Sequence, residues 1–268
     1  MKIYRDVQLL DKIVSKIKEN WGDGSRDGIH ASDLLSPRKA YFQKTQPLPP
    51  TMKEIMYFLS GLAIETGLSE LLGVDHAPSK VFNGISYTPD FFIDGITELK
   101  SRRAYLPEEG KEADVYGHYI SQIVKYVAYE GQDKGNLLVF ALNEKIDDGK
   151  KTEPQLVAYR LEFTEDELNE ARESSIRMKD LLAESIETRN HTILPQCPSW
   201  MCGRTLKVMT KKPYCHTCSK EFESDWGIGK HLDAKGKSNH VVTKAEYRYD
   251  FEPECKYYEA CKPVIRMK

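Results

Sequence analysis

Two carboxylates and a lysine lie close together between Ile85 and Arg103: Asp90 follows a proline, and Glu98 and Lys100 come shortly after it. Hydrolysis of a phosphodiester needs a deprotonated water and neutralisation of charge on the phosphate. Carboxylate oxygens can hold Mg²⁺ or Mn²⁺, which supplies both. A lysine beside the metal can orient the water and stabilise negative charge. We therefore predict a metal-dependent hydrolytic site with Asp90 and Glu98 as metal ligands.

The local pattern around these residues predicts a β-hairpin over about residues 81–102. Asp94-Gly95 is typical of a tight two-residue turn. Glu98 and Lys100 are two apart on the second strand and so share one face. In a regular two-residue hairpin Asp90 would pair with Leu99 and point to the other face. We expect a bulge or a strong local twist of the strand to turn Asp90 to the face of Glu98 and Lys100. The alternative interpretation is a solvated, charged hairpin.

Two helices predicted on either side of the hairpin carry further candidates. Residues 51–72 begin with a Thr-x-x-Glu capping box and end before a glycine, and Glu65 on this helix is a possible third carboxylate ligand. Downstream, Gln122 and Tyr126 are four apart and share one helical face. The alternative interpretations are a surface carboxylate for Glu65 and an ordinary amphipathic helix for Gln122 and Tyr126.

The ordered set of an acidic helix residue, Asp90, Glu98-x-Lys100 and Gln122-x-x-x-Tyr126 resembles the PD-(D/E)XK nuclease superfamily. The Gln-x-x-x-Tyr pattern resembles its RecB-like branch, which includes the CRISPR-associated RecB-type exonucleases. The resemblance implies an α/β fold with a mixed central sheet flanked by helices. It also implies that Glu65, Asp90 and Glu98 bind Mg²⁺ or Mn²⁺, that Lys100 is catalytic, and that Gln122 and Tyr126 hold the substrate strand.

The segment ASDLLSPRKAYFQK, residues 31–44, resembles the opening segment of RecB-type nucleases. Ser36 stands where the iron–sulfur members carry their first cysteine, which is a departure from that pattern. Arg38 and Lys39 are candidates for phosphate contact. Glu65 is a second departure, because many CRISPR-associated members have histidine there. Activity is not put in doubt, but metal preference could differ.

The 268 residues suffice for one large core and an appended module, and 40% hydrophobic with 30% charged residues is typical of a soluble globular protein. We expect no membrane span, no signal peptide and a cytoplasmic location, with a core-facing helix over about residues 3–21. The net charge of −2 alone does not suggest nucleic-acid binding. Residues 197–268, however, hold 14 Lys and Arg against 9 Asp and Glu, which is compatible with phosphate contact.

All six cysteines follow residue 196, and in a cytoplasmic protein they are better interpreted as metal ligands than as disulfides. Cys215-x2-Cys218-x12-His231-x8-His240 resembles a two-Cys/two-His zinc finger over residues 213–241. Such a finger depends on Zn²⁺ for its stability. The last gap is longer than usual, which is a departure from the finger pattern.

Four cysteines remain: Cys197, Cys202, Cys255 and Cys261. The closing segment, residues 252–263, resembles the C-terminal cysteine segment of RecB-like nucleases that bind an iron–sulfur cluster. Four thiolates would suit a four-iron four-sulfur cluster or a second Zn²⁺.

A rival pairing stays open. In it, the first two cysteines of this group would join Cys215 and Cys218 in a four-cysteine ribbon, and His231 and His240 would join the last two. Some of the cysteines could also be free buried thiols.

We therefore predict a RecB-like nuclease core over residues 1–196 and a cysteine-rich tail over residues 197–268. The predicted activity is metal-dependent hydrolysis of DNA, with single-stranded ends as the favoured substrate of an exonuclease. One alternative is a restriction-type or structure-specific endonuclease. Another is a non-catalytic nucleic-acid-binding protein on a nuclease fold. The sequence does not indicate the oligomeric state.

Overall fold

The computed structural model describes residues 26–102, 106–142, 146–147, 150–151, 154–197, 199–233 and 240–261, with a few positions between 8 and 19. Most of the helix predicted over residues 3–21 lies outside the described residues. The chain forms two compact units, Met1–Gln196 and Cys197–Lys268, and each is described by itself.

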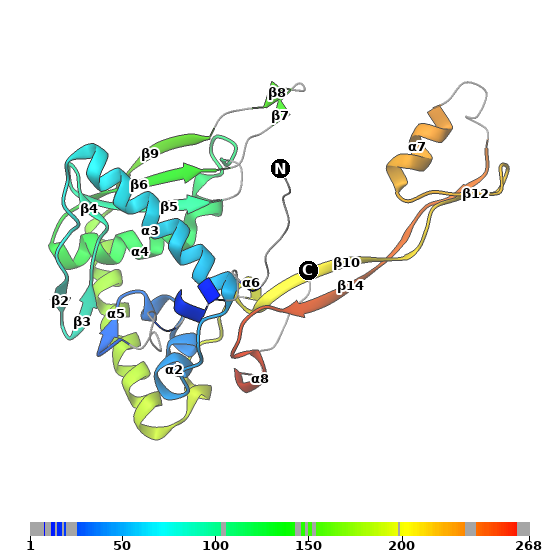
Figure 1. Ribbon diagram of the computed structural model, residues 1–268. Helices are drawn as coiled ribbons and strands as arrows, with labels where there is room; N and C mark the ends of the chain where they lie inside the picture. Colours follow the sequence, from blue (N-terminus) through cyan, green and yellow to red (C-terminus); the bar gives the residue numbers. More distant parts are fainter. Residues whose placement is uncertain are drawn as a thin grey trace. The chain divides into compact units, whose positions relative to one another are not determined.

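The first unit is built on a four-stranded sheet in the order β4-β5-β6-β9 (Figure 1). β4 (Phe91–Phe92) runs antiparallel to β5 (Ile96–Arg102), and β5 runs parallel to β6 (Lys134–Ala141). β9 (Gln155–Glu162) closes the sheet antiparallel to β6. Helices flank this mixed sheet, so the predicted α/β fold class is confirmed.

Two long helices pack on the sheet, and a third packs on the other helices. α3 (Met52–Leu72) packs against β5, and α4 (Glu112–Glu130) packs against β5 and β6. α5 (Glu165–Thr188) packs against α4 and against α2 (Pro37–Thr45). The capping box predicted at the start of α3 is present, and residue 73 ends this helix in the left-handed conformation. A second capping box starts α5.

Short elements complete the first unit. A second sheet joins β1 (Ile29–His30), β3 (Ile85–Tyr87) and β2 (Lys80–Phe82) in that order. The remaining pieces are the 3-10 helices η1 (Asp33–Leu35) and η2 (His191–Ile193) and the strands β7 (Ile146–Asp147) and β8 (Lys150–Lys151).

A glycine lets α4 approach the sheet closely. A Cβ atom at Gly135 in β6 would lie 2.8 Å from Cγ2 of Ile123 and 2.8 Å from Cγ2 of Val127. Both of these α4 side chains are fully buried. The glycine therefore sets the distance at which α4 presents its polar residues to β5.

The hairpin of β4 and β5 has a longer loop than predicted. Phe92 pairs with Ile96, so three residues connect the strands where two were expected. Asp94 and Gly95 in this loop have positive φ angles of 52° and 114°. The prediction of a two-residue turn is therefore wrong, because a three-residue loop also places an Asp-Gly pair in the left-handed region.

The extra loop residue shifts the strand register by one. Continued backwards from the observed pairs, the register places Asp90 opposite Glu98 and not opposite Leu99. The two carboxylates thus share one face. The three-residue loop therefore places Asp90 on the face of Glu98, an effect that was expected to come from a bulge.

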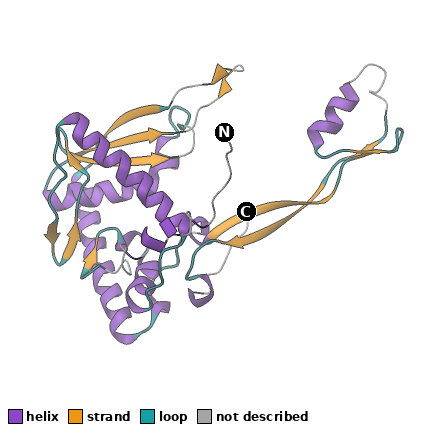
Figure 2. Cartoon of the chain, viewed as in Figure 1, coloured by secondary structure: helices purple, strands orange, loops and turns teal. Residues whose placement is uncertain are grey.

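The second unit is an antiparallel ribbon that carries a small module (Figure 2). β10 (Gly203–Lys211) pairs with β14 (Glu246–Pro253) along its length, and the sequence analysis did not predict this ribbon. The module inserted between the two strands contains β11 (Tyr214–Cys215), β12 (Lys220–Glu221) and β13 (Val242–Thr243), which pair, and α7 (Asp225–Asp233). Two single-turn helices, α6 (Ser199–Cys202) and α8 (Tyr258–Cys261), lie beside the ribbon in sequence.

Within the part of the chain that the structure describes, α3 alone is long and apolar enough to cross a membrane by length and composition. The mean hydropathy of its most apolar window is 1.3, and 6% of that window is buried. One such helix is weak evidence for a span. α3 packs against β5 and belongs to the first unit.

Candidate active site and metal centre

The structure brings five of the predicted site residues together on one side of the sheet. Glu98 and Lys100 project from β5, Asp90 directly precedes β4, and Gln122 and Tyr126 project from α4. Each position follows from a local feature. The three-residue loop aligns the hairpin, the strand period aligns the two β5 side chains, and the i, i+4 spacing aligns the two helical ones.

Glu98 is the centre of the cluster and is 1% exposed. Its Oε1 accepts hydrogen bonds from Nζ of Lys100 and from Nε2 of Gln122, the latter at 2.7 Å. Its Oε2 is buried and makes no hydrogen bond with any described residue. A buried carboxylate oxygen without a donor is costly in free energy, and a divalent cation is a partner that would remove that cost.

Asp90 is held against the same strand by the backbone. Its Oδ2 accepts a hydrogen bond of 2.7 Å from the amide of Leu99. The bond to Oδ2 therefore fixes the direction of the carboxylate, and Oδ1 can take a further ligand. The residues present thus fit a site for Mg²⁺ or Mn²⁺, which take carboxylate oxygens as ligands.

The pKa values reflect crowded carboxylates around one lysine. Burial raises the pKa of the Glu98 carboxyl to about 7. The positive charge of Lys100 opposes this increase, and the negative charge of Asp90 adds to it. Burial also raises the pKa of Asp90. Burial lowers the pKa of Lys100, but the two carboxylates outweigh that effect and raise it. Without a metal the protein disfavours full ionisation here, and a bound divalent cation would favour it.

Gln122 links the helix to the centre of the cluster. Its Nε2 lies 2.7 Å from Oε1 of Glu98 and 2.8 Å from the hydroxyl of Tyr126. Burial raises the pKa of Tyr126, and the Glu98 carboxylate adds to that, so the phenol stays neutral and able to donate. The pair therefore orients Glu98 from α4.

Glu65 projects from α3 and has a histidine partner that its sequence context did not indicate. His76 Nδ1 lies 3.0 Å from Oε1 of Glu65. Burial raises the pKa of Glu65, and the Asp90 carboxylate adds to that, so the two carboxyls are within electrostatic reach. A single histidine in a loop gives no spacing signal, and the contact arises only from the tertiary fold.

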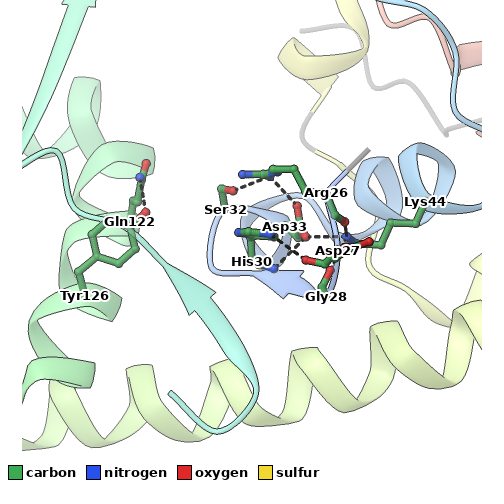
Figure 3. Close-up of polar contacts among 9 residues, drawn as sticks. All are labelled: Arg26, Asp27, Gly28, His30, Ser32, Asp33, Lys44, Gln122 and Tyr126. Atoms are coloured by element: carbon green, nitrogen blue, oxygen red, sulfur yellow. Dashed lines mark hydrogen bonds and ion pairs between the residues drawn. The ribbon is translucent and has the colours of Figure 1, made fainter. Parts of the chain in front are cut away.

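Arg26 was also missed, because it lies in a loop of small and polar residues. Its guanidinium contacts the hydroxyl of Ser32 at 3.2 Å and Asp33 at 3.1 Å (Figure 3). Its side chain is 54% exposed. Arg26 opposes the pKa increase of Tyr126, so it lies within electrostatic reach of the Gln-x-x-x-Tyr pair. Together with Lys44 it borders a cavity of about 280 Å³.

Arg38, predicted as a phosphate contact, has another role. It is 6% exposed, and its guanidinium donates a hydrogen bond of 2.5 Å to the carbonyl of Leu194. The prediction is wrong because Arg38 is turned into the interior to tie α2 to the segment after η2. Lys39 is half-buried.

In the second unit, Cys215, Cys218, His231 and His240 come together, with one ligand atom from each within 4.8 Å of the others. Nδ1 of His240 lies 3.6 Å from Sγ of Cys215, 3.3 Å from Sγ of Cys218 and 3.2 Å from Nε2 of His231. These separations fit four ligands around one tetrahedral ion such as Zn²⁺. The geometry favours the finger pairing over the rival four-cysteine ribbon.

Of the other four cysteines, two are linked by a backbone hydrogen bond. The carbonyl of Cys202 accepts hydrogen bonds from the amides of Glu254 and Cys255, at 2.9 Å and 3.0 Å. Cys261 ends the single turn of α8 shortly afterwards. The ribbon thus brings two of the predicted ligands side by side. Their joint metal site with Cys197 stays a prediction.

No protein-family model matches the sequence, and no curated protein matches it. Among solved structures, the fold is similar to that of SSO0001, with a TM-score of 0.45 and 16% identity, over 74% of this chain and 93% of that chain. It is also similar to an alkaline exonuclease from Laribacter hongkongensis, with a TM-score of 0.41 and 18% identity, over 64% and 95% of the two chains. A phage-related exonuclease from Haemophilus somnus 129PT has a TM-score of 0.39 and 15% identity, over 58% and 83%. Because every TM-score is below 0.5, no functional conclusion follows from these similarities.

Proposed function

We propose that this chain is a metal-dependent deoxyribonuclease of the PD-(D/E)XK superfamily, of RecB-like type, that acts as an exonuclease on single-stranded DNA ends. The observation that carries the proposal is the buried cluster of Asp90, Glu98 and Lys100, with Oε2 of Glu98 buried and without a described hydrogen-bond donor. A protein with no ion to bind would gain stability by replacing such a group.

Asp90, Glu98 and Glu65 would hold Mg²⁺ or Mn²⁺, which would lower the pKa of a bound water and neutralise phosphate charge. The chain's own residues do the rest. Lys100 lies beside Glu98, where its ammonium can orient the attacking water and stabilise charge on the phosphate. Gln122 contacts both Glu98 and the Tyr126 hydroxyl, and this pair would hold the substrate strand.

Recognition of an end, and so the exonuclease choice, is supported by Arg26. Its side chain is half exposed, and its guanidinium contacts the Ser32 hydroxyl as well as Asp33. Both lie within the same unit as Gln122 and Tyr126 (Figure 3). A guanidinium with an adjacent hydroxyl suits a terminal phosphate, which carries more charge than an internal phosphodiester.

The preference for single strands is supported by the exposed face of α3. Phe58 and Leu62 are 53% and 44% exposed and lie seven and three residues before Glu65, on one helical stripe. Unpaired bases stack on such apolar and aromatic side chains, whereas bases in a duplex are covered. The stripe leads to the residue that would hold the metal.

In the second unit we propose Zn²⁺ on Cys215, Cys218, His231 and His240. We further propose a four-iron four-sulfur cluster or a second Zn²⁺ on Cys197, Cys202, Cys255 and Cys261. Free thiolates are needed for both sites, which fits a reducing, cytoplasmic compartment.

The test is cleavage of end-labelled linear and circular DNA, single- and double-stranded, with Mg²⁺ or Mn²⁺. We expect loss of label from linear single strands and intact circles, with slower cleavage by Arg26→Ala on phosphorylated ends. Arg177→Ala is the matched control, because it removes an exposed, ion-paired arginine from α5 in the same unit. Cutting of circles would show an endonuclease, and no cleavage under any metal would overturn the proposed nuclease activity.

A further inference from the structure

His76 lies in the connection between α3 and β2 and contacts both elements that bring carboxylates to the site. Its ring stacks on Phe91, the residue after Asp90, with centroids 5.7 Å apart and planes inclined by 24°. The next amide in the chain, from Ala77, donates a hydrogen bond of 3.2 Å to the carbonyl of Asp90. The backbone hydrogen bond of Ala77 and the stacking of the His76 ring on Phe91 therefore hold this segment against the hairpin of β4 and β5.

The third contact of His76 reaches the helix. Nδ1 lies 3.0 Å from Oε1 of Glu65. An ionised carboxylate can only accept, so Nδ1 carries the hydrogen and donates it. This occupies one oxygen of Glu65 and leaves Oε2 for another ligand. Glutamate is a long side chain, and without such a bond it would lose conformational freedom on meeting a metal.

We propose that His76 is a positioning residue that holds Glu65 in the direction required of a metal ligand, and that it couples α3 to the hairpin of Asp90. This inference rests on the metal site of the proposed function. Partners of this kind, which bind a ligand and not the ion, commonly change metal affinity by about 10–100-fold.

The electrostatic surroundings agree with this role. Burial and the Asp90 carboxylate both raise the pKa of Glu65, whereas His76 opposes them. His76 thus favours the ionised form of Glu65, which is the form that binds a cation. Burial raises the pKa of Asp90 too, and Lys100 and His76 both oppose that increase.

The experiment is direct Mn²⁺ binding to the full chain, measured by electron paramagnetic resonance of free Mn²⁺ and by calorimetry, without substrate. We expect His76→Ala to weaken binding by about 10–100-fold. His76→Asn keeps an N–H donor near the position of Nδ1 and should recover most of the loss. Asp75→Asn, which changes an exposed neighbour in the same connection, is the matched control and should bind as wild type.

A double-mutant cycle separates positioning from a general structural effect. If His76 acts through Glu65, His76→Ala should change Mn²⁺ affinity little in a Glu65→Ala background. Equal losses in both backgrounds, or wild-type affinity in His76→Ala, would overturn the inference and leave the proposed function standing. Absence of Mn²⁺ binding by the wild type would overturn the proposed metal site itself.

Discussion

At the scale of single residues, spacing in the sequence was enough to predict two pairs of residues in the site. Glu98 and Lys100 share one strand face, and Gln122 and Tyr126 lie one helical turn apart, so local geometry predicts each of these pairs. The register of Asp90 and the contact of Gln122 with Glu98 depend on the fold, and the sequence pointed to them only through the family resemblance. Partners that meet through tertiary contacts, such as the ring of a loop histidine on Glu65, leave no such pattern.

Glu98 gives a prediction for pH. Its pKa in the folded protein is about 7, above the ordinary 4.5. Its contribution to the stability of the metal-free protein is therefore fully present below pH 4.5 and is lost as the pH rises towards 7. Glu98→Gln mimics the protonated form, so the metal-free wild type should melt progressively below this variant as pH rises.

Thermal unfolding between pH 4.5 and 8, with and without Mn²⁺, measures this effect. Mn²⁺ should raise the melting temperature of the wild type at pH 8 and have little effect on Glu98→Gln. A difference between wild type and variant that does not change with pH would mean that Glu98 ionises normally.

At the scale of elements, the caps of α3 and α5 were predictable because a capping box uses only nearby residues. The length of the loop between β4 and β5 was not predictable. Asp-Gly favours positive φ in two-residue and three-residue loops alike, and only the packing of the strands decides between them. The long ribbon of β10 and β14 was missed because its strands are separated by the whole finger module.

Strand register gives a prediction at this scale. Inserting one alanine between Asp90 and Phe91, with the observed strand pairs kept, should move Asp90 opposite Leu99, so its carboxylate would leave the site. Circular dichroism should show a folded protein, while Mn²⁺ binding and any cleavage fall strongly. Asp94→Asn removes the exposed ion pair with Arg160 but keeps the strand register, and it should behave as wild type. Unchanged Mn²⁺ affinity in the insertion variant would contradict the register argument.

At the scale of the whole molecule, the two units should respond separately to loss of Zn²⁺. Small finger modules depend on the ion for about 10–16 kcal/mol of folding free energy. Cys218→Ser should therefore lose one equivalent of zinc per chain and the hydrogen-exchange protection of α7, and the unfolding of Met1–Gln196 should not change.

The matched control for the finger is His216→Ala. This histidine lies in the same module, but its Nε2 contacts the hydroxyl of Thr243 at 2.7 Å and it is not one of the four grouped ligands. The His216→Ala variant should keep one equivalent of zinc per chain. Full zinc content in Cys218→Ser would mean that the ion sits elsewhere among the cysteines.

The central claim is that the cluster around Glu98 hydrolyses DNA with a divalent metal. The most direct test is cleavage of labelled single-stranded DNA by wild type and Lys100→Ala, each with Mn²⁺, with Mg²⁺ and with a chelator. We predict cleavage by the wild type with metal alone, and a rate lower by about 10²–10⁴-fold in the variant, which loses the group that orients the water and stabilises the phosphate charge. Equal rates in the two proteins, or cleavage that survives the chelator, would contradict the assignment.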